Sequence, residues 1–356
     1  MTRTERARKR KRTKRAIIPV LFIVILILGA IMGVMLQKET ARKKEEAKLA
    51  VTPPVLTLSG DSAVNMVYGD EFKDPGFTAT DAYGDDISAS VETEIPDIDQ
   101  SGEYEIKYAV TDKNGNRAEA SRKLNVTFPP QTKEGKKRGL SVLMYHKVYD
   151  PAKPPKKGVD ANCIKASVLE EELKYLVEKG YYFPTWKEVR QYLDGEIDLP
   201  EKSVCLTFDD GTTLFEENGV PLIEKYDVRA TAFIIGTKRG KHWSQTDYKH
   251  LWLESHSYDM HRPGGNIGHG GVFTALSYDD ALADLNKSIK LLGSGDAFAY
   301  PFGDYDDQCL KVVKDAGFLC AFTTEYGKIH PGDNPVKLTR VRVQGSPSLN
   351  QFKSLL

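Results

Sequence analysis

Two adjacent carboxylates, Asp209 and Asp210, follow a short apolar segment at 204–208 and stand directly before Gly211. An apolar run of this length is typical of a strand buried on both faces in a parallel α/β sheet, and a glycine permits a sharp turn where the strand ends. Successive side chains at a strand end point in different directions, so the two carboxylates can face neighbouring points of one cavity. One carboxylate could then bind a cation while the other moves a proton. The alternative is an ordinary Asp-Gly turn.

Two imidazoles, His256 and His261, follow a second apolar segment at 251–255 and lie five residues apart. Residues at this spacing diverge by about 140° around a helix and lie on opposite faces of a strand, so both can reach one ion only from an irregular loop. Two imidazoles and one carboxylate are the three protein ligands of a catalytic zinc site, which keeps a position for water or substrate. Taken singly, each histidine would be an ordinary polar loop residue. The pair predicts a divalent metal site, with Zn²⁺ favoured, formed by Asp210, His256 and His261.

The segments that must position these residues alternate between apolar strands and amphipathic helices. Strands are expected at 140–145, 204–208, 230–236, 251–255, 297–300, 320–323 and 338–343. Helices are expected at 167–179, 185–193, 219–226, 278–292 and 306–316, and another is expected to begin at 351–356. Ser167 and Glu170 have the spacing of a capping box for the first helix. Repeated strand–helix units indicate a parallel sheet closed into a barrel, with the active site at the carboxyl ends of the strands.

Three motifs in this region occur in the order found in polysaccharide deacetylases with a NodB homology domain. They are TFDDG at 207–211, HSYDMH at 256–261 and YPFGD at 300–304, and LMYHKV at 143–148 is similar to the opening strand of that domain. The resemblance extends from residue 140 to the C-terminus and implies a distorted (β/α) barrel. The histidine spacing and the YPFG sequence resemble the branch that acts on poly-N-acetylglucosamine more than the peptidoglycan branch.

The resemblance also implies a role for each central residue. Asp209 matches the general base, and Asp210, His256 and His261 match the metal ligands. A carboxylate beside a dication stays ionised at neutral pH and can accept a proton from the attacking water. The implied reaction is hydrolysis of an N-acetyl group to acetate and a free amine.

Residues around the third motif are expected on the substrate side. A backbone N–H after Tyr300 or Pro301 is a candidate donor to the oxyanion, with Phe302 beside it. His146 and Asp304 could line the groove or orient a ligand, and a structural hydrogen bond is the alternative for both.

The chain departs from the family pattern at two positions. Many members carry an arginine two residues before the proline of the third motif, where it orients the base, and this chain has Ala299 there. A late Leu-x-His motif, whose histidine acts as general acid, has no clear match, and the nearest late histidine is His330 in a loop rich in glycine and proline. These departures leave the proton donor open.

The N-terminal part has the composition of a membrane anchor. Lysine and arginine number 50 and aspartate and glutamate 50, so the total charge favours no partner and no nucleic acid is expected, but nine basic residues lie within 3–15. An apolar run of 21 residues follows at 16–36, which is long enough to cross a bilayer as a helix. The positive-inside rule keeps residues 1–15 in the cytoplasm and the rest outside. A cleavable signal peptide is the alternative, but no Ala-x-Ala-like site adjoins the run.

A charged stalk at 37–52 leads to a segment of different character at 53–128, where about seven short alternating strands are separated by turn signals. This pattern predicts a small all-β sandwich and resembles bacterial immunoglobulin-like modules, here interpreted as a spacer, with glycan binding as the alternative. A linker at 129–139 precedes the deacetylase-like domain at 140–356.

The four cysteines, Cys163, Cys205, Cys309 and Cys320, contain no Cys-x-x-Cys spacing, which argues against a structural zinc site and a disulfide framework. Cys205 is expected to fill a buried strand, and Cys309 and Cys320 are expected to be free thiols, although they could pair outside the cell.

Together these features predict a membrane-anchored extracellular deacetylase that acts on a glycan containing N-acetylglucosamine. An O-acetyl esterase and a glycan-binding protein without activity are the alternatives.

Overall fold

The computed structural model describes the backbone of residues 3–356 and the side chains of residues 19–356. The chain divides into two compact units, one within residues up to 125 and the other mainly Val126–Leu356, with the short segments Val67–Gly69 and Asp99–Ser101 grouped with the second. Each unit is described by itself.

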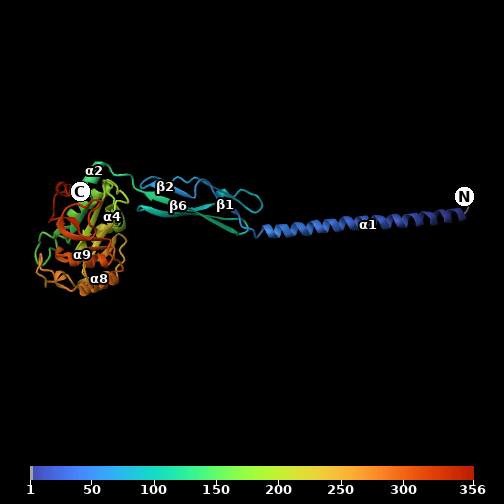
Figure 1. Ribbon diagram of the computed structural model, residues 1–356. Coiled ribbons are helices and arrows are strands. Elements are labelled where there is room, and N and C mark those ends of the chain that lie inside the picture. The colour runs from blue at the N-terminus through green and yellow to red at the C-terminus, as the bar shows by residue number, and fades with distance from the viewer. Residues whose placement is uncertain (1–2) are drawn as a thin grey trace. The chain divides into compact units, whose positions relative to one another are not determined.

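The chain begins with one long helix, α1 (Arg3–Leu49), shown in blue in Figure 1. Among the described residues, its part Pro19–Leu49 is the one helix long and apolar enough to cross a membrane, a property that signal sequences share. The predicted span at 16–36 lies in this helix, and the predicted stalk continues it to Leu49. The basic side chains of the predicted cytoplasmic tail at 1–15 lie outside the described residues.

The β-rich module forms two sheets, β1–β3 and β2–β6–β5–β4, in which β1 is antiparallel to β3 and β4 is antiparallel to β5. The strands are β1 (Val55–Leu58), β2 (Ala63–Val67), β3 (Phe77–Thr80), β4 (Glu92–Glu94), β5 (Gly102–Thr111) and β6 (Arg117–Thr127). Ile106, Val110 and Leu124 are buried between them. The described strands number six rather than about seven, because the segment after β3 forms a turn and a short 3-10 helix, η1 (Ser88–Ser90). The fold is compatible with the immunoglobulin-like module expected from the sequence.

The second unit is built on a closed barrel with the strand order β10–β11–β12–β13–β14–β15–β7. The strands are β7 (Ser141–Tyr145), β10 (Val204–Phe208), β11 (Ala230–Ile234), β12 (Leu251–Ser255), β13 (Ala297–Ala299), β14 (Cys320–Tyr326) and β15 (Leu338–Arg342). All neighbouring strands are parallel, which confirms the predicted α/β barrel. Every residue of β10 is buried, as expected for a strand enclosed on both faces.

Helices and short accessory elements surround the barrel, and α8 and α9 lie side by side on its outside (Figure 1). The helices are α2 (Lys133–Arg138), α3 (Ala166–Glu178), α4 (Trp186–Leu193), α5 (Thr213–Asn218), α6 (Val220–Lys225), α7 (Lys241–Trp243), α8 (Tyr278–Leu292), α9 (Asp307–Asp315) and α10 (Leu349–Lys353). Single turns are η2 (Gly236–Gly240), η3 (Val272–Ala275) and η4 (Pro301–Gly303), and a two-stranded parallel sheet consists of β8 (Lys147–Tyr149) and β9 (Cys163–Lys165).

Two local predictions about helices are wrong. Strand β9 leads directly into α3, so the helix starts at Ala166 after Lys165, which provides no side-chain cap, and Ser167 lies inside the first turn. Glu170 instead forms an ion pair with Lys225 of α6. The last helix, α10, ends at Lys353, whereas a helix was expected to begin at 351–356.

The core under the carboxyl end of β10 is aromatic. The rings of Tyr145, Phe208, Phe215 and Trp243 form a continuous stack with centroid distances of 4.9, 4.2 and 6.2 Å. All four side chains are buried, and their packing supports the end of β10, which Asp209 follows directly.

The four cysteines are free and buried in the described structure, Cys205 within β10. Cys309 and Cys320 do not pair, as expected.

Candidate metal centre and active site

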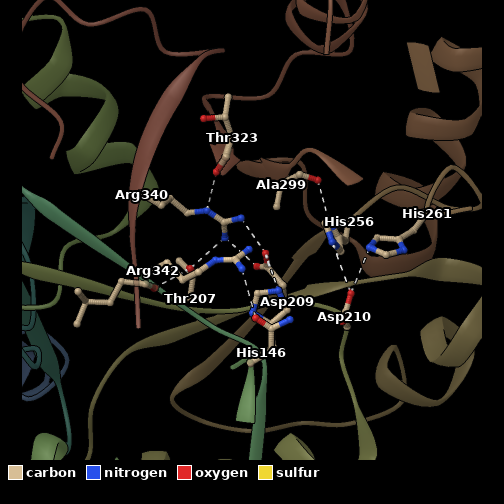
Figure 2. A network of polar contacts seen from close by, with 12 residues as sticks. His146, Thr207, Asp209, Asp210, His256, His261, Ala299, Thr323, Arg340 and Arg342 are labelled. Carbon is tan, nitrogen blue, oxygen red and sulfur yellow. Dashed lines mark hydrogen bonds and ion pairs between the residues drawn. The ribbon is translucent and has the colours of Figure 1, made fainter. Parts of the chain in front are cut away.

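Parallel strands in a closed barrel end at one edge, and three ionisable side chains meet there. Asp210 follows β10, and His256 and His261 come from the loop after β12. The Nε2 atoms of His256 and His261 lie 3.7 and 3.4 Å from Asp210 Oδ1 (Figure 2). One possible ligand atom from each residue lies within 4.8 Å of the others. The structure therefore brings together the three residues predicted to bind a metal ion.

Hydrogen bonding fixes which nitrogen of His256 faces Asp210. His256 Nδ1 lies 2.7 Å from the carbonyl oxygen of Ala299. A carbonyl can only accept, so Nδ1 carries the proton and the lone pair of Nε2 is free for a cation. Burial and then the neighbouring His256 lower the pKa of His261 to about 4, which leaves the His261 imidazole neutral at neutral pH. Two imidazoles and a carboxylate are a ligand set that fits a divalent cation such as Zn²⁺.

Backbone strain is concentrated around these ligands. Asp210, Ser257 and Phe302 have φ angles of 75°, 67° and 62°, in the left-handed region that non-glycine residues rarely adopt. The Phe302 ring packs against His261 with a centroid distance of 4.2 Å. Such strain persists only where surrounding contacts enforce it, and it clusters at functional sites.

Asp209 forms a buried ion pair with Arg340 of β15. Arg340 Nη1 and Nη2 donate to Asp209 Oδ1 and Oδ2 at 2.8 and 2.7 Å, and both residues are 2% exposed or less (Figure 2). Arg340 Nε also donates to the carbonyl oxygen of Thr323 at 3.1 Å. Burial alone would raise the pKa of Asp209, but the charge and hydrogen bonds of Arg340 outweigh it and hold that pKa well below its usual range. Asp209 therefore stays ionised.

Arg340 was missed by sequence reasoning, which sought this arginine at position 299. Ala299 contributes only its carbonyl, to His256. The sequence did contain an indication of such a residue. Arg340 and Arg342 occupy alternate positions of β15, in a segment that is otherwise apolar enough to be a buried strand. Alternate residues share a face, and a buried arginine requires a partner.

His146 follows β7 and also faces Asp209. Its Nε2 lies 4.0 Å from Asp209 Oδ2, and Figure 2 shows both His146 and Arg340 turned toward that carboxylate. Burial lowers the pKa of His146, although the charges of Asp209 and Asp210 oppose this effect, and the charges of Arg340 and Arg342 add to it. The imidazole is therefore neutral at neutral pH and lies beside the candidate base.

The residues of the third motif lie in two places, some in the hydrophobic core and some beside the candidate metal centre. The Tyr300 side chain is buried and donates to the carbonyl oxygen of Val336 at 2.8 Å, so its ring cannot contact a substrate. Pro301 opens the single turn η4, and Phe302 covers His261. The N–H of Phe302 remains the predicted oxyanion donor.

Asp304 has a structural role in this geometry. Its carboxylate is buried and accepts from the backbone N–H groups of His269 and Gly271 at 2.8 and 2.9 Å. It thus holds the glycine-rich loop that follows His261, rather than lining a groove.

His330 lies at the other end of the barrel. The adjacent Ile329 pairs with Leu140, just before β7 begins, and His330 Nε2 lies 3.3 Å from the carbonyl oxygen of Lys137. The site lies where β7 ends, so His330, named above as the nearest late histidine, does not lie beside it.

Two parts of the chain match known families. Residues 196–321 match the model described as polysaccharide deacetylase, and residues 56–126 match that of a bacterial surface protein Ig-like domain. These segments fall in the barrel and in the β-rich module, respectively.

Individual relatives agree with the family match. A poly-beta-1,6-N-acetyl-D-glucosamine N-deacetylase of Staphylococcus aureus strain MRSA252 is 28% identical over 243 residues, covering 60% of this chain and 82% of the relative. The protein of the same name from strain MSSA476 is 30% identical over 200 residues, covering 51% of this chain and 67% of the relative. The solved structure of IcaB from Ammonifex degensii is similar with a TM-score of 0.50 and 25% identity, over 61% of this chain and 95% of that one.

Proposed function

Because this chain belongs to the polysaccharide deacetylase family, we propose that it is a metal-dependent hydrolase that removes N-acetyl groups from a polysaccharide containing N-acetylglucosamine. The observation that carries the proposal is the meeting, at one edge of the barrel, of the Asp209–Arg340 pair with the cluster Asp210, His256 and His261. The names of the staphylococcal relatives support poly-β-1,6-N-acetylglucosamine as the polymer to test first.

Asp210, His256 and His261 would hold the cation, with Zn²⁺ expected. When bound, a divalent cation would polarise the acetyl carbonyl and lower the pKa of water. Asp209, kept ionised by Arg340, accepts a proton as water attacks the carbonyl carbon. The Phe302 N–H is the proposed donor to the oxyanion.

Departure of the sugar amine requires a proton on its nitrogen as the carbon–nitrogen bond breaks. His146 is a candidate for this step, because its Nε2 lies 4.0 Å from Asp209 Oδ2. It can pass the proton taken up by Asp209 to the amine, which yields acetate and a free amino sugar.

The N-terminal helix and the β-rich module are consistent with a function outside the cell. The apolar part of α1 would anchor the protein in the membrane, the basic residues before it would stay in the cytoplasm, and the β-rich module would act as a spacer. This arrangement would present the barrel to an exopolysaccharide or to the cell wall.

The test uses the full chain in detergent with a panel of acetylated glycans. Products from poly-N-acetylglucosamine oligomers, chitooligosaccharides and acetyl xylan are compared by mass spectrometry, with and without a chelator. We expect amine products from the first two substrates, loss of activity with chelator and recovery on adding Zn²⁺. Acetate release from acetyl xylan alone would establish an O-acetyl esterase, and no release from any glycan would favour a binding protein without activity.

A further inference from the structure

The loop that carries both histidines, residues 256–261, is held from outside the barrel. Its left-handed residue, Ser257, donates its backbone N–H to Ser255 Oγ at 3.1 Å, and Ser257 Oγ accepts from the N–H of Met260 at 3.0 Å. The N–H groups of Tyr258 and Asp259 lie in the chain between the two histidines, and both donate to a side chain outside the loop. Neither group has its acceptor within the loop itself.

Helix α8 supplies those acceptors. Asp284 Oδ1 accepts from the Tyr258 N–H at 2.7 Å, and Oδ2 accepts from the Asp259 N–H at 2.8 Å. One turn further along, Ser288 Oγ lies 2.8 Å from Ser255 Oγ. Residues four apart share a helix face, so Asp284 meets the loop while Ser288 meets the end of β12, whose Ser255 Oγ accepts from the Ser257 N–H. The buried Ala281 and Leu285 fix that face of α8 against the barrel.

We propose that Asp284 and Ser288 are positioning residues that hold the histidine loop in the conformation required for metal binding. This inference rests on the proposed function, because it assumes that His256 and His261 are ligands. Two charge-assisted hydrogen bonds from one carboxylate fix the two peptide groups between them. Without this support the left-handed Ser257 relaxes, and binding a cation must restore the conformation. Asp284 and Ser288 are not among the candidate ligands, so we expect them to affect metal affinity rather than the chemical step.

The central variant is Asp284→Asn in the full chain. Its amide nitrogen cannot accept, so one loop N–H loses its partner and faces another donor. We expect the dissociation constant for Zn²⁺, measured by competition with a chromogenic chelator, to rise about 10- to 100-fold. The absorption spectrum of the Co²⁺-loaded protein should change with the geometry of the imidazoles. The matched control is Asp279→Asn, which removes the same charge from an exposed position on the same helix.

A second readout separates positioning from general destabilisation. Turnover of Asp284→Asn should return toward the wild-type value as the Zn²⁺ concentration is raised, whereas damage to the fold would not be relieved in this way. Zinc affinity equal to that of wild type and of Asp279→Asn would overturn the inference. Should Asp284→Asn not fold, Ser288→Ala decides: a weaker zinc affinity supports the proposal, and an unchanged one contradicts it. A wild-type protein that binds no divalent metal would instead overturn the proposed function.

Discussion

The chemistry of single residues depends on one buried charge pair. Asp209 is almost fully enclosed, and the bidentate contact from Arg340 is what keeps it ionised. Asp209 is also the proposed general base, so a change at this residue should affect both the stability of the barrel and the proposed reaction.

The first prediction removes the base. Asp209→Asn keeps the shape of the side chain but cannot accept a proton, so kcat should fall by about 10² to 10⁴-fold. Zinc affinity should persist, because the candidate ligands are untouched. Steady-state release of acetate and chelator competition measure the two quantities. Retention of wild-type turnover would remove Asp209 from the mechanism.

The second prediction removes the partner of the base. Arg340→Met leaves an unpaired buried carboxylate, so the free energy of unfolding should drop by about 3–5 kcal/mol. Urea unfolding followed by tryptophan fluorescence is a suitable measurement, since Trp186, Trp243 and Trp252 all lie in the barrel unit.

The double variant Arg340→Met with Asp209→Asn serves as the control, because it leaves no unpaired charge. It should regain much of that stability but none of the activity. Equal stability of the two variants would argue against the ion pair as the cause.

At the scale of elements, the two loops that carry the candidate ligands are held by different helices. Helix α8 holds the histidine loop, and Trp243 at the end of α7 donates from Nε1 to the carbonyl oxygen of Gly211 at 2.9 Å, next to the left-handed Asp210. A Cβ on Gly211 would approach Ile234 and Trp243 within 2.8 Å, so glycine is required at this turn.

The third prediction tests the contact to Gly211. Trp243→Phe keeps an aromatic ring beside Phe215 but loses the hydrogen bond, which should cost about 0.5–1.5 kcal/mol of stability and weaken zinc binding. Calorimetric zinc titration of the full chain measures the affinity. Tyr248→Phe, which removes a nearby hydroxyl from Glu216 instead, should leave zinc binding unchanged. Identical affinity in both variants would show that Trp243 does not hold Asp210.

The fourth prediction concerns α3 and pH. Glu172 is buried against the Tyr145 hydroxyl, its Oε1 has no hydrogen-bond partner among the described residues, and burial raises its pKa to about 8. The folded state therefore keeps the proton while the unfolded chain releases it above the ordinary value of 4.5. Stability is fully present below that value and falls as the pH rises toward 8.

Glu172→Gln removes this titration. Relative to wild type, the variant should gain up to about 1.4 kcal/mol for each pH unit between those limits. Urea unfolding at pH 5 and pH 8 measures the gain, and the exposed neighbour provides the control variant Glu171→Gln. A difference that is constant with pH would contradict the assignment.

For the whole molecule, the sequence predicted the parts whose signals are local. Each barrel strand was recognisable as an apolar run, and Asp210, His256 and His261 follow such runs directly, so the rule that parallel strands end at one edge was enough to group them. The contact between Arg340 and Asp209 was not predicted, because it depends on the pairing of β15 with β7. These two residues are 131 positions apart in the sequence. The misplaced start of α3 has a local cause: β9 continues into the helix without a capping residue.

The fifth prediction concerns the anchor. If α1 stays uncleaved, the protein should remain in the membrane fraction after an alkaline carbonate wash, and its mass should equal that of the full chain. Removal of residues 1–36 should release it. Recovery of a shorter, soluble form from the unmodified gene would establish a signal peptide instead.

Barrel closure also imposes an order in time on the maturation of the protein. Asp210, His256 and His261 leave the ribosome well before β15, yet Asp209 acquires its arginine only after residue 340 has been synthesised and the final strand has docked beside the first. A partly exported chain could therefore capture zinc while it is still unable to hydrolyse an amide. If the proposed topology and mechanism hold, catalytic competence would be the last property that the protein gains.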